Sequence, residues 1–170
     1  MKAQLSFDFY FSLIVFIVFV ASLFFKLITF FPLYSEEVSL QKLRAEAYQI
    51  SEILVNDAGY PGNWHTDVPN TKRLGLSDEI KNKTNILSAS KITAFDSLCN
   101  SAGGYNKVLD LLDIKDGFLT SFVDKSIEPN VVLMTCLPPE AFAKLRVEIN
   151  RTVAFGSSAF GELRVSMWKI

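Results

Sequence analysis

The sequence has little of what catalytic and metal sites are usually built from. Its 170 residues include one histidine, His65, and two cysteines, Cys99 and Cys136. A zinc site needs several histidine or cysteine ligands at suitable spacing, and His65 has no such companions. The sequence also lacks the Gly-x-Ser-x-Gly motif of serine hydrolases and the glycine-rich motifs that bind phosphates. We therefore expect a non-enzymatic protein with no metal ion and no cofactor, in which His65 is a solvated loop residue.

The chain also lacks an excess of charge of either sign. It has 17 lysine and arginine residues against 18 aspartate and glutamate residues, and its formal net charge is -1. Lys2, Lys26 and Asp8 are the charges of the N-terminal segment, so the rest of the chain is nearly neutral. Proteins that bind nucleic acid need a basic surface to neutralise phosphates. A nucleic acid partner is therefore not expected.

Hydrophobic residues, by contrast, are concentrated at one end of the chain. From Phe9 to Phe31 the sequence is almost entirely apolar, and Lys26 is its only charge. As a helix this run would span roughly 35 Å, which is enough to cross a hydrocarbon core of about 30 Å. The run is longer than the apolar region of a secretory signal peptide, and more phenylalanines follow Ala21-Ser22 in place of a polar mature start. The sequence thus predicts a retained, single-pass membrane helix.

The few charges around this run indicate its orientation. Lys2 and the free N-terminus favour an N-terminus on the inner side, and residues 35–37 add no positive charge beyond the run. Lys26 can extend its side chain toward the far interface. The large domain that follows would then face outward, and it would lie at the cell surface if the protein is assembled there.

Two further features are consistent with an outward-facing domain. Cysteine pairs outside the cell are usually oxidised, so Cys99 and Cys136 either form a disulfide or remain as two buried thiols. The chain also has two sequons for N-glycosylation, which begin at Asn82 and Asn150. Asn82 and Asn150 are therefore candidate glycosylation sites.

The segment before the apolar run carries a resemblance to a known family. Lys2-Ala3-Gln4-Leu5-Ser6-Phe7-Asp8, followed by the run, resembles the class III signal peptide of archaeal type IV pilin-like proteins. In that family a prepilin-type peptidase removes a short basic leader just before a glutamine, and Gln-x-Ser-x-acidic opens the hydrophobic helix. The resemblance implies cleavage between Ala3 and Gln4. Ala3 departs from the family pattern, in which glycine is commoner at this position.

Asp8 has two interpretations. Near the start of a helix, it can act as a cap and interact favourably with the positive end of the helix dipole. The resemblance implies a second role, because the family has an acidic residue at this place near the mature N-terminus. In that role Asp8 neutralises the new α-amino group of Gln4 in a neighbouring subunit. A carboxylate at a membrane edge is costly unless it reaches the interface or finds a cation, which suits an assembly contact.

The sequence predicts three parts: a leader at 1–3, a membrane or pilin-type helix at 4–34, and an extracytoplasmic domain at 35–170. Pro32 predicts a kink or an interruption, because proline lacks an N–H and disfavours a helical conformation in the residue before it. Ser35 then predicts a new helix start. Apolar residues at helical spacing indicate an amphipathic helix over 35–58, which Gly59 can close.

A loop should follow this helix. Residues 59–64, Gly-Tyr-Pro-Gly-Asn-Trp, are dense in turn formers, and Trp64 is expected to be partly buried and to fix the loop against the domain. Together with 72–76, this stretch resembles the segment after the N-terminal helix in many archaeal pilin-like proteins. Polar residues at 77–85 predict a second loop.

The remaining elements follow from periodicity. A short helix is expected at 88–98, with Ile92, Phe95 and Leu98 facing inward, and another at 105–112. Alternation predicts strands at 118–123, 130–136, 145–154 and 161–169. The last two should pair antiparallel through a Gly-Ser turn, in a small sheet packed on the amphipathic helix. The predicted fold class is α+β, in which a long N-terminal helix carries a domain with short helices and a C-terminal antiparallel sheet.

These features favour a structural function. The leading hypothesis is a pilin-like subunit of a cell-surface filament, held in the membrane until peptidase cleavage and assembled with sister subunits through its apolar helix. One alternative is a single-pass anchored surface protein that binds a ligand or an envelope partner and never polymerises. Another is an anchored enzyme, which would need a cleft with perturbed titratable groups. A major subunit and a minor one look alike at this level.

Overall fold

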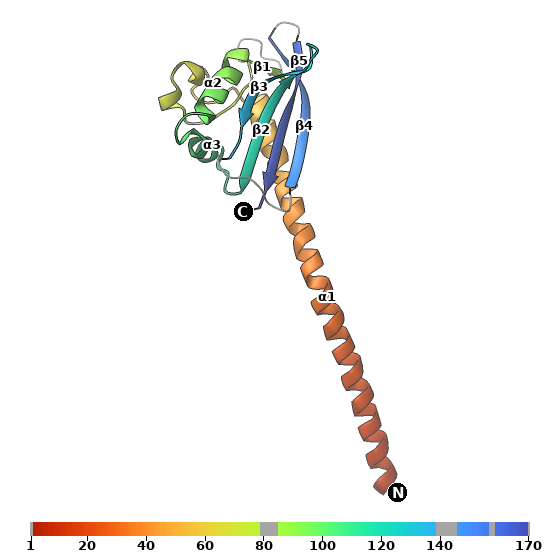
Figure 1. Cartoon of the computed structure of the whole chain (residues 1–170). Coiled ribbons are helices and arrows are strands. Elements are labelled where there is room, and N and C mark those ends of the chain that lie inside the picture. The colour runs from red at the N-terminus through yellow and green to blue at the C-terminus, as the bar shows by residue number, and fades with distance from the viewer. Residues whose placement is uncertain (1, 79–84, 139–145, 157–158, 170) are drawn as a thin grey trace. The chain divides into compact units, whose positions relative to one another are not determined.

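The computed structural model describes residues 2–78, 85–138, 146–156 and 159–169 (Figure 1). Its elements, in chain order, are α1 (Lys2–Asn56), the 3-10 helices η1 (Trp64–Thr66) and η2 (Val68–Asn70), β1 (Ile86–Leu87), α2 (Ala89–Cys99), α3 (Gly104–Leu112), β2 (Gly117–Asp124), β3 (Val131–Cys136), β4 (Arg146–Phe155) and β5 (Ala159–Trp168). A long N-terminal helix is thus followed by short helices and an antiparallel-rich sheet. The predicted α+β class is confirmed.

Helix α1 is continuous through Pro32, so the predicted interruption there and the new helix start at Ser35 are wrong. Proline inside a helix removes one hydrogen bond and costs roughly 3 kcal/mol. Ending the helix would instead leave four N–H and four C=O groups without helical partners. Those groups would be especially costly next to an apolar environment, where water cannot satisfy them. Continuing the helix through Pro32 therefore costs less free energy than interrupting it there.

The chain divides into two compact units, Met1–Gln41 and Lys42–Ile170. The first unit is helical, and the second contains the rest of α1 together with all other elements. The core of the protein lies in the second unit, because the buried apolar residues begin at Leu43.

The sheet has five strands in the order β1-β4-β5-β2-β3. Strands β4 and β5 are antiparallel, with Arg146 opposite Trp168 and Phe155 opposite Ala159, which confirms the predicted pairing. Strand β2 lies between β5 and β3 and is antiparallel to both. Strand β1 is parallel to β4 and was not predicted, because two residues are too few to show a periodic pattern.

One face of this sheet forms most of the core. Phe118, Thr120 and Phe122 on β2 are fully buried. Leu163, Val165 and Met167 on β5 are also fully buried and lie opposite them in the ladder. The segment of α1 within the same unit contributes its own buried stripe at helical spacing, namely Leu43, Ala47, Ile50 and Leu54. These residues join helix and sheet in a single hydrophobic core.

Helices α2 and α3 have the positions that periodicity predicted. Ile92, Phe95 and Leu98 of α2 are buried, which confirms the predicted inward face. Helix α3 is tied to the sheet by Tyr105, whose hydroxyl donates to the Phe118 carbonyl oxygen at 2.8 Å. Partial burial raises the pKa of the Tyr105 hydroxyl, so this group stays protonated and able to donate.

Candidate processing and assembly segment

The predicted cleavage point lies at the beginning of α1. The helix starts at Lys2, so Ala3 and Gln4 belong to its first turns. Asp8 follows further inside the helix, with an exposed side chain. A capping residue must stand at the helix boundary. Asp8 therefore does not cap α1 in the uncut chain, which leaves its carboxylate without the structural role that the sequence offered as one interpretation.

The apolar run after Asp8 is uncovered. An 18-residue window of the helix Phe7–Asn56 has a mean hydropathy of 2.7, and none of that window is buried. Phe16, Phe24 and Phe31 illustrate the exposure, since 61% or more of each residue is accessible. Soluble monomers rarely expose contiguous apolar patches larger than a few hundred Å². This helix is long and apolar enough to cross a membrane.

Two charges bracket the most apolar part of the run. Asp8 precedes it and Lys26 interrupts it near the far end, and both side chains are exposed. Between them an open apolar groove runs along the helix surface, lined by Phe11, Ser12, Val15, Phe16 and Phe19. Because these residues are spaced at three, four and eight positions, they form one face of α1. The segment thus combines an apolar face with a carboxylate near one end and an ammonium group near the other.

The loop after α1 is fixed by a buried tryptophan. Trp64 is fully buried, beyond the partial burial that was expected, and its Nε1–H donates to the Gly75 carbonyl oxygen at 2.9 Å. Helix α1 ends at Asn56, and Gly59 lies three residues further on with a φ of +83°. A Cβ atom on Gly75 would lie 2.2 Å from the Asp57 carbonyl oxygen, so only glycine fits there. The loop at 59–64, which resembles a segment of archaeal pilin-like proteins, therefore serves to pack the domain.

A buried lysine joins this loop to α2. Lys91 is 3% exposed, and its Nζ donates to the carbonyl oxygens of Ala58 at 2.8 Å and Ser77 at 2.9 Å. The ammonium group thereby satisfies the Ala58 carbonyl just beyond the C-terminal end of α1, where the helix dipole also favours a cation, and the more distant Ser77 carbonyl. Sequence reasoning did not select Lys91.

An arginine ties the sheet to α1 within the second unit. Arg151 on β4 donates from Nε to the Ser51 hydroxyl at 2.9 Å and from Nη2 to the Glu52 carboxylate. Its guanidinium also lies 4.7 Å from the centroid of the Tyr48 ring, a cation–π arrangement. The hydrogen bond from Arg151, and then one from Tyr48, hold the pKa of the Glu52 carboxyl below its usual value. This cluster was also missed by sequence reasoning.

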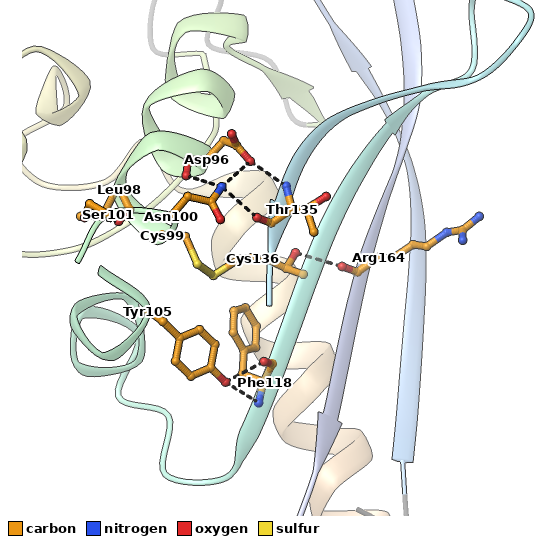
Figure 2. Close-up of a disulfide and its surroundings, with 11 residues drawn as sticks. Asp96, Leu98, Cys99, Asn100, Ser101, Tyr105, Phe118, Thr135, Cys136 and Arg164 are labelled. Atoms are coloured by element: carbon orange, nitrogen blue, oxygen red, sulfur yellow. Dashed lines mark hydrogen bonds between the residues drawn. A yellow bond between two sulfur atoms is a disulfide. The ribbon is translucent and has the colours of Figure 1, made fainter. Parts of the chain in front are cut away.

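Cys99 and Cys136 are joined in a disulfide (Figure 2), so the bonded alternative holds in the structure. The bond connects the end of α2 to the end of β3. Beside it, Asp96 accepts a hydrogen bond from the Thr135 N–H at 2.8 Å, and Asn100 donates to the Thr135 carbonyl oxygen. The side chains of Asp96 on α2 and of Asn100, its C-cap residue, thus satisfy the outer edge of β3 at this point, where a neighbouring strand would otherwise pair.

The other predicted site residues lie apart from this segment. Asn150 is exposed on β4, whereas Asn82 lies outside the described residues. His65 is half-buried in η1, and its Nδ1 is buried without a hydrogen-bond partner in the described part of the chain, so the expected solvated position is wrong. Within the same described ranges, histidine, cysteine, aspartate and glutamate residues form no group that could hold a metal ion.

The structure thus places Ala3, Gln4 and Asp8 on the part of α1 that belongs to the first unit, and it places His65, Cys99, Cys136 and Asn150 in the second unit. Lys91 and Arg151 are the additional residues that connect parts of the second unit, and both have structural contacts rather than an open site. No protein-family model, curated protein or solved structure is similar to this chain.

Proposed function

We propose that this chain is a non-enzymatic, pilin-like subunit of a cell-surface filament. The observation that carries the proposal is the uncovered apolar segment Phe9–Phe31, which follows a short leader and precedes a domain with a core of its own. A helix this apolar needs lipid or other apolar helices around it. The domain does not need the segment for its core, so the segment is available for contacts outside the chain.

The membrane holds the subunit first. The run matches the thickness of a hydrocarbon core, and Lys26 can extend its ammonium group to an interface. The second unit then lies on the outer side, where an oxidising environment supports the Cys99–Cys136 disulfide. A prepilin-type peptidase removes the leader between Ala3 and Gln4, which creates a new α-amino group at Gln4.

Assembly then exchanges lipid for sister helices. Lipid tails are about as apolar as leucine, so helix association in a membrane depends on packing and polar contacts more than on hydrophobic burial. Large side chains such as Phe11 and Phe19 provide the packing surface. Asp8 provides the polar contact, because its carboxylate neutralises the α-amino group of Gln4 in a neighbouring subunit. The outward domains stay at the filament surface.

N-terminal sequencing of the membrane-extracted protein tests the first step. The expected sequence begins at Gln4 in cells with an active prepilin-type peptidase and at Met1 in matched cells with an inactive one. Sheared surface material, probed for the chain, tests the second step and should contain it in a high-molecular-weight form.

Two results would contradict the proposal. An intact Met1 start in cells with active peptidase would exclude processing. A chain that is cut at Gln4, yet recovered only as monomers in the membrane, would instead favour the anchored surface protein that never polymerises.

A further inference from the structure

Asp8 and Lys26 lie on the same face of α1. Lys26 follows Asp8 by 18 residues, which at 3.6 residues per turn is five complete turns. In this continuous helix the two side chains therefore point in the same direction, roughly 27 Å apart along the axis. Neither group has a hydrogen bond or an ion pair with any residue that the structure describes. The apolar groove of Phe11 to Phe19 lies on the same side, between them.

One copy cannot join its own two charges. An ion pair needs its nitrogen and oxygen atoms within about 4 Å, far less than the separation along the helix. A second copy inserted by the same route has the same orientation, so the two helices run parallel. For parallel helices, Asp8 of one copy meets Lys26 of the other only when the copies are displaced by roughly 27 Å along the axis. This displacement is close to the thickness of a hydrocarbon core, about 30 Å.

On the basis of the proposed function, we propose that Asp8 of one subunit pairs with Lys26 of a second subunit, displaced outward by about one membrane thickness. In the bilayer each copy keeps Asp8 at the inner interface and Lys26 near the outer one. A copy lifted outward brings its Asp8 to the level at which the next copy presents Lys26. The pair then replaces water contacts that both groups lose as they enter the apolar filament core.

This contact differs from the one between Asp8 and the α-amino group of Gln4. That group lies four residues from Asp8, so it belongs to a neighbour displaced by only about 6 Å. A carboxylate has two oxygens and can accept from both cations. The two contacts are therefore made with different neighbours, and changes at Lys26 affect only the new one.

The first test compares Lys26→Gln with Lys26→Arg in the full chain, with Lys42→Gln as a matched control on the same helix outside the apolar run. Lys26→Gln should reduce sheared filament by roughly tenfold or more, because it removes the cation that neutralises Asp8 from the displaced neighbour in an apolar core. Lys26→Arg and Lys42→Gln should assemble like the unchanged chain. Carbonate-resistant chain in the membrane is measured in parallel, and Lys26→Gln should insert normally since it removes a charge.

The second test maps the displacement. One tagged copy carries Asp8→Cys and a second, differently tagged copy carries Lys26→Cys, while Cys99 and Cys136 remain in their disulfide. Oxidation should link the two copies. The control pair, Asp8→Cys with Ser22→Cys, moves the partner by one turn and should link roughly tenfold less, because a disulfide requires Cβ atoms within about 4.5 Å.

The outcomes separate this inference from the proposed function. If the unchanged chain forms filaments and Lys26→Gln forms them equally well, the ion pair is excluded and the filament function stands. Loss of assembly in both Lys26→Gln and Lys26→Arg, or preferential linking to position 22, also overturns the pairing. If the unchanged chain forms no filaments at all, the proposed function is wrong, and the pairing that rests on it is wrong as well.

Discussion

Lys91 carries a positive charge into the interior of the second unit, where two backbone carbonyls accept its hydrogen bonds. Lys91→Met keeps much of the length of the side chain but removes the ammonium group and, with it, both of these hydrogen bonds. Leaving the oxygens of Ala58 and Ser77 buried without these bonds should lower the free energy of unfolding by roughly 2–4 kcal/mol. Denaturant unfolding of the full chain in detergent, followed by tryptophan fluorescence, measures this change.

The control for this prediction is Lys115→Met, at an exposed position of the same unit. A surface substitution should change the free energy of unfolding by less than about 0.5 kcal/mol. If Lys91→Met were as stable as Lys115→Met, the two hydrogen bonds would not contribute to the stability of the fold.

Glu52 gives a prediction about pH. Its hydrogen bond with Arg151 lowers the carboxyl pKa below the usual 4.5, so the folded state binds a proton less readily than the unfolded chain does. The resulting stabilisation is fully present above pH 4.5 and disappears as the pH falls through the lower, folded-state pKa. Glu52→Gln cannot titrate, so its stability should decline less steeply below that pH.

Unfolding free energies measured from pH 7 to pH 3 for both chains test this. The comparison isolates Glu52, because Glu162, whose pKa is lowered chiefly by its hydrogen bond with Arg164, titrates in both. Parallel curves for the two chains would show that the Arg151 contact does not bias the protonation of Glu52.

Lys91 and Arg151, which sequence reasoning missed, both lie at positions that fit the period of their helix or strand. Lys91 precedes Phe95 by four positions and Leu98 by seven, so it belongs to the buried face of its helix. Arg151 continues the alternation of Val147 and Val153 on the inward face of β4. What the pattern could not supply is the partner of each cation, because these partners are distant in sequence and come together only through the fold.

At the scale of elements, the disulfide holds β3 at the edge of the sheet. It closes a loop with a sequence separation of 37 residues. In the loop-entropy description, such a bond stabilises a fold by about 4 kcal/mol. Replacing both Cys99 and Cys136 with serine should therefore lower the free energy of unfolding by an amount of that order.

Reductant provides the check on this prediction. The unchanged chain should lose stability when it is reduced, whereas the double serine variant should be insensitive to reductant. If reduction destabilised both chains equally, the effect would not come from this bond.

Most elements could be predicted because their patterns are local. The alternation of Leu163, Val165 and Met167 shows a half-buried strand without knowledge of its neighbours. Strand β1 and the order of the strands depend on pairings between distant segments, which periodicity does not encode. Pro32 illustrates the opposite error: a reliable local rule predicted an interruption, and the long helix on both sides overrode it.

The candidate processing segment was accessible from sequence for a different reason. The short run from Lys2 to Asp8, with a charge at each end, is visible before any folding. The structure shows one continuous helix through both Asp8 and Lys26. Their five-turn spacing was also implicit in the sequence, because both residues lie within the helix predicted at 4–34.

At the scale of the whole molecule, the two units make separate demands on their surroundings. A chain comprising only 42–170 retains all the apolar residues that are buried in the described part of the protein, starting with Leu43. Produced under oxidising conditions, it should fold and remain soluble without detergent, whereas the full chain should require detergent or lipid. Gel filtration and circular dichroism of the two chains measure this difference, and an aggregated or unfolded 42–170 chain would contradict it.

The strand order also links folding to the direction of synthesis. Strand β5 comes last in the chain order of the sheet, yet it lies between β4 and β2. Until residues 159–168 have emerged, β4 has no antiparallel partner and the β2–β3 pair has no connection to it. During synthesis, the second unit would therefore have an incomplete sheet until residues 159–168 have emerged. A chain that stopped before residue 159 would therefore lack the strand that joins β4 to the β2–β3 pair.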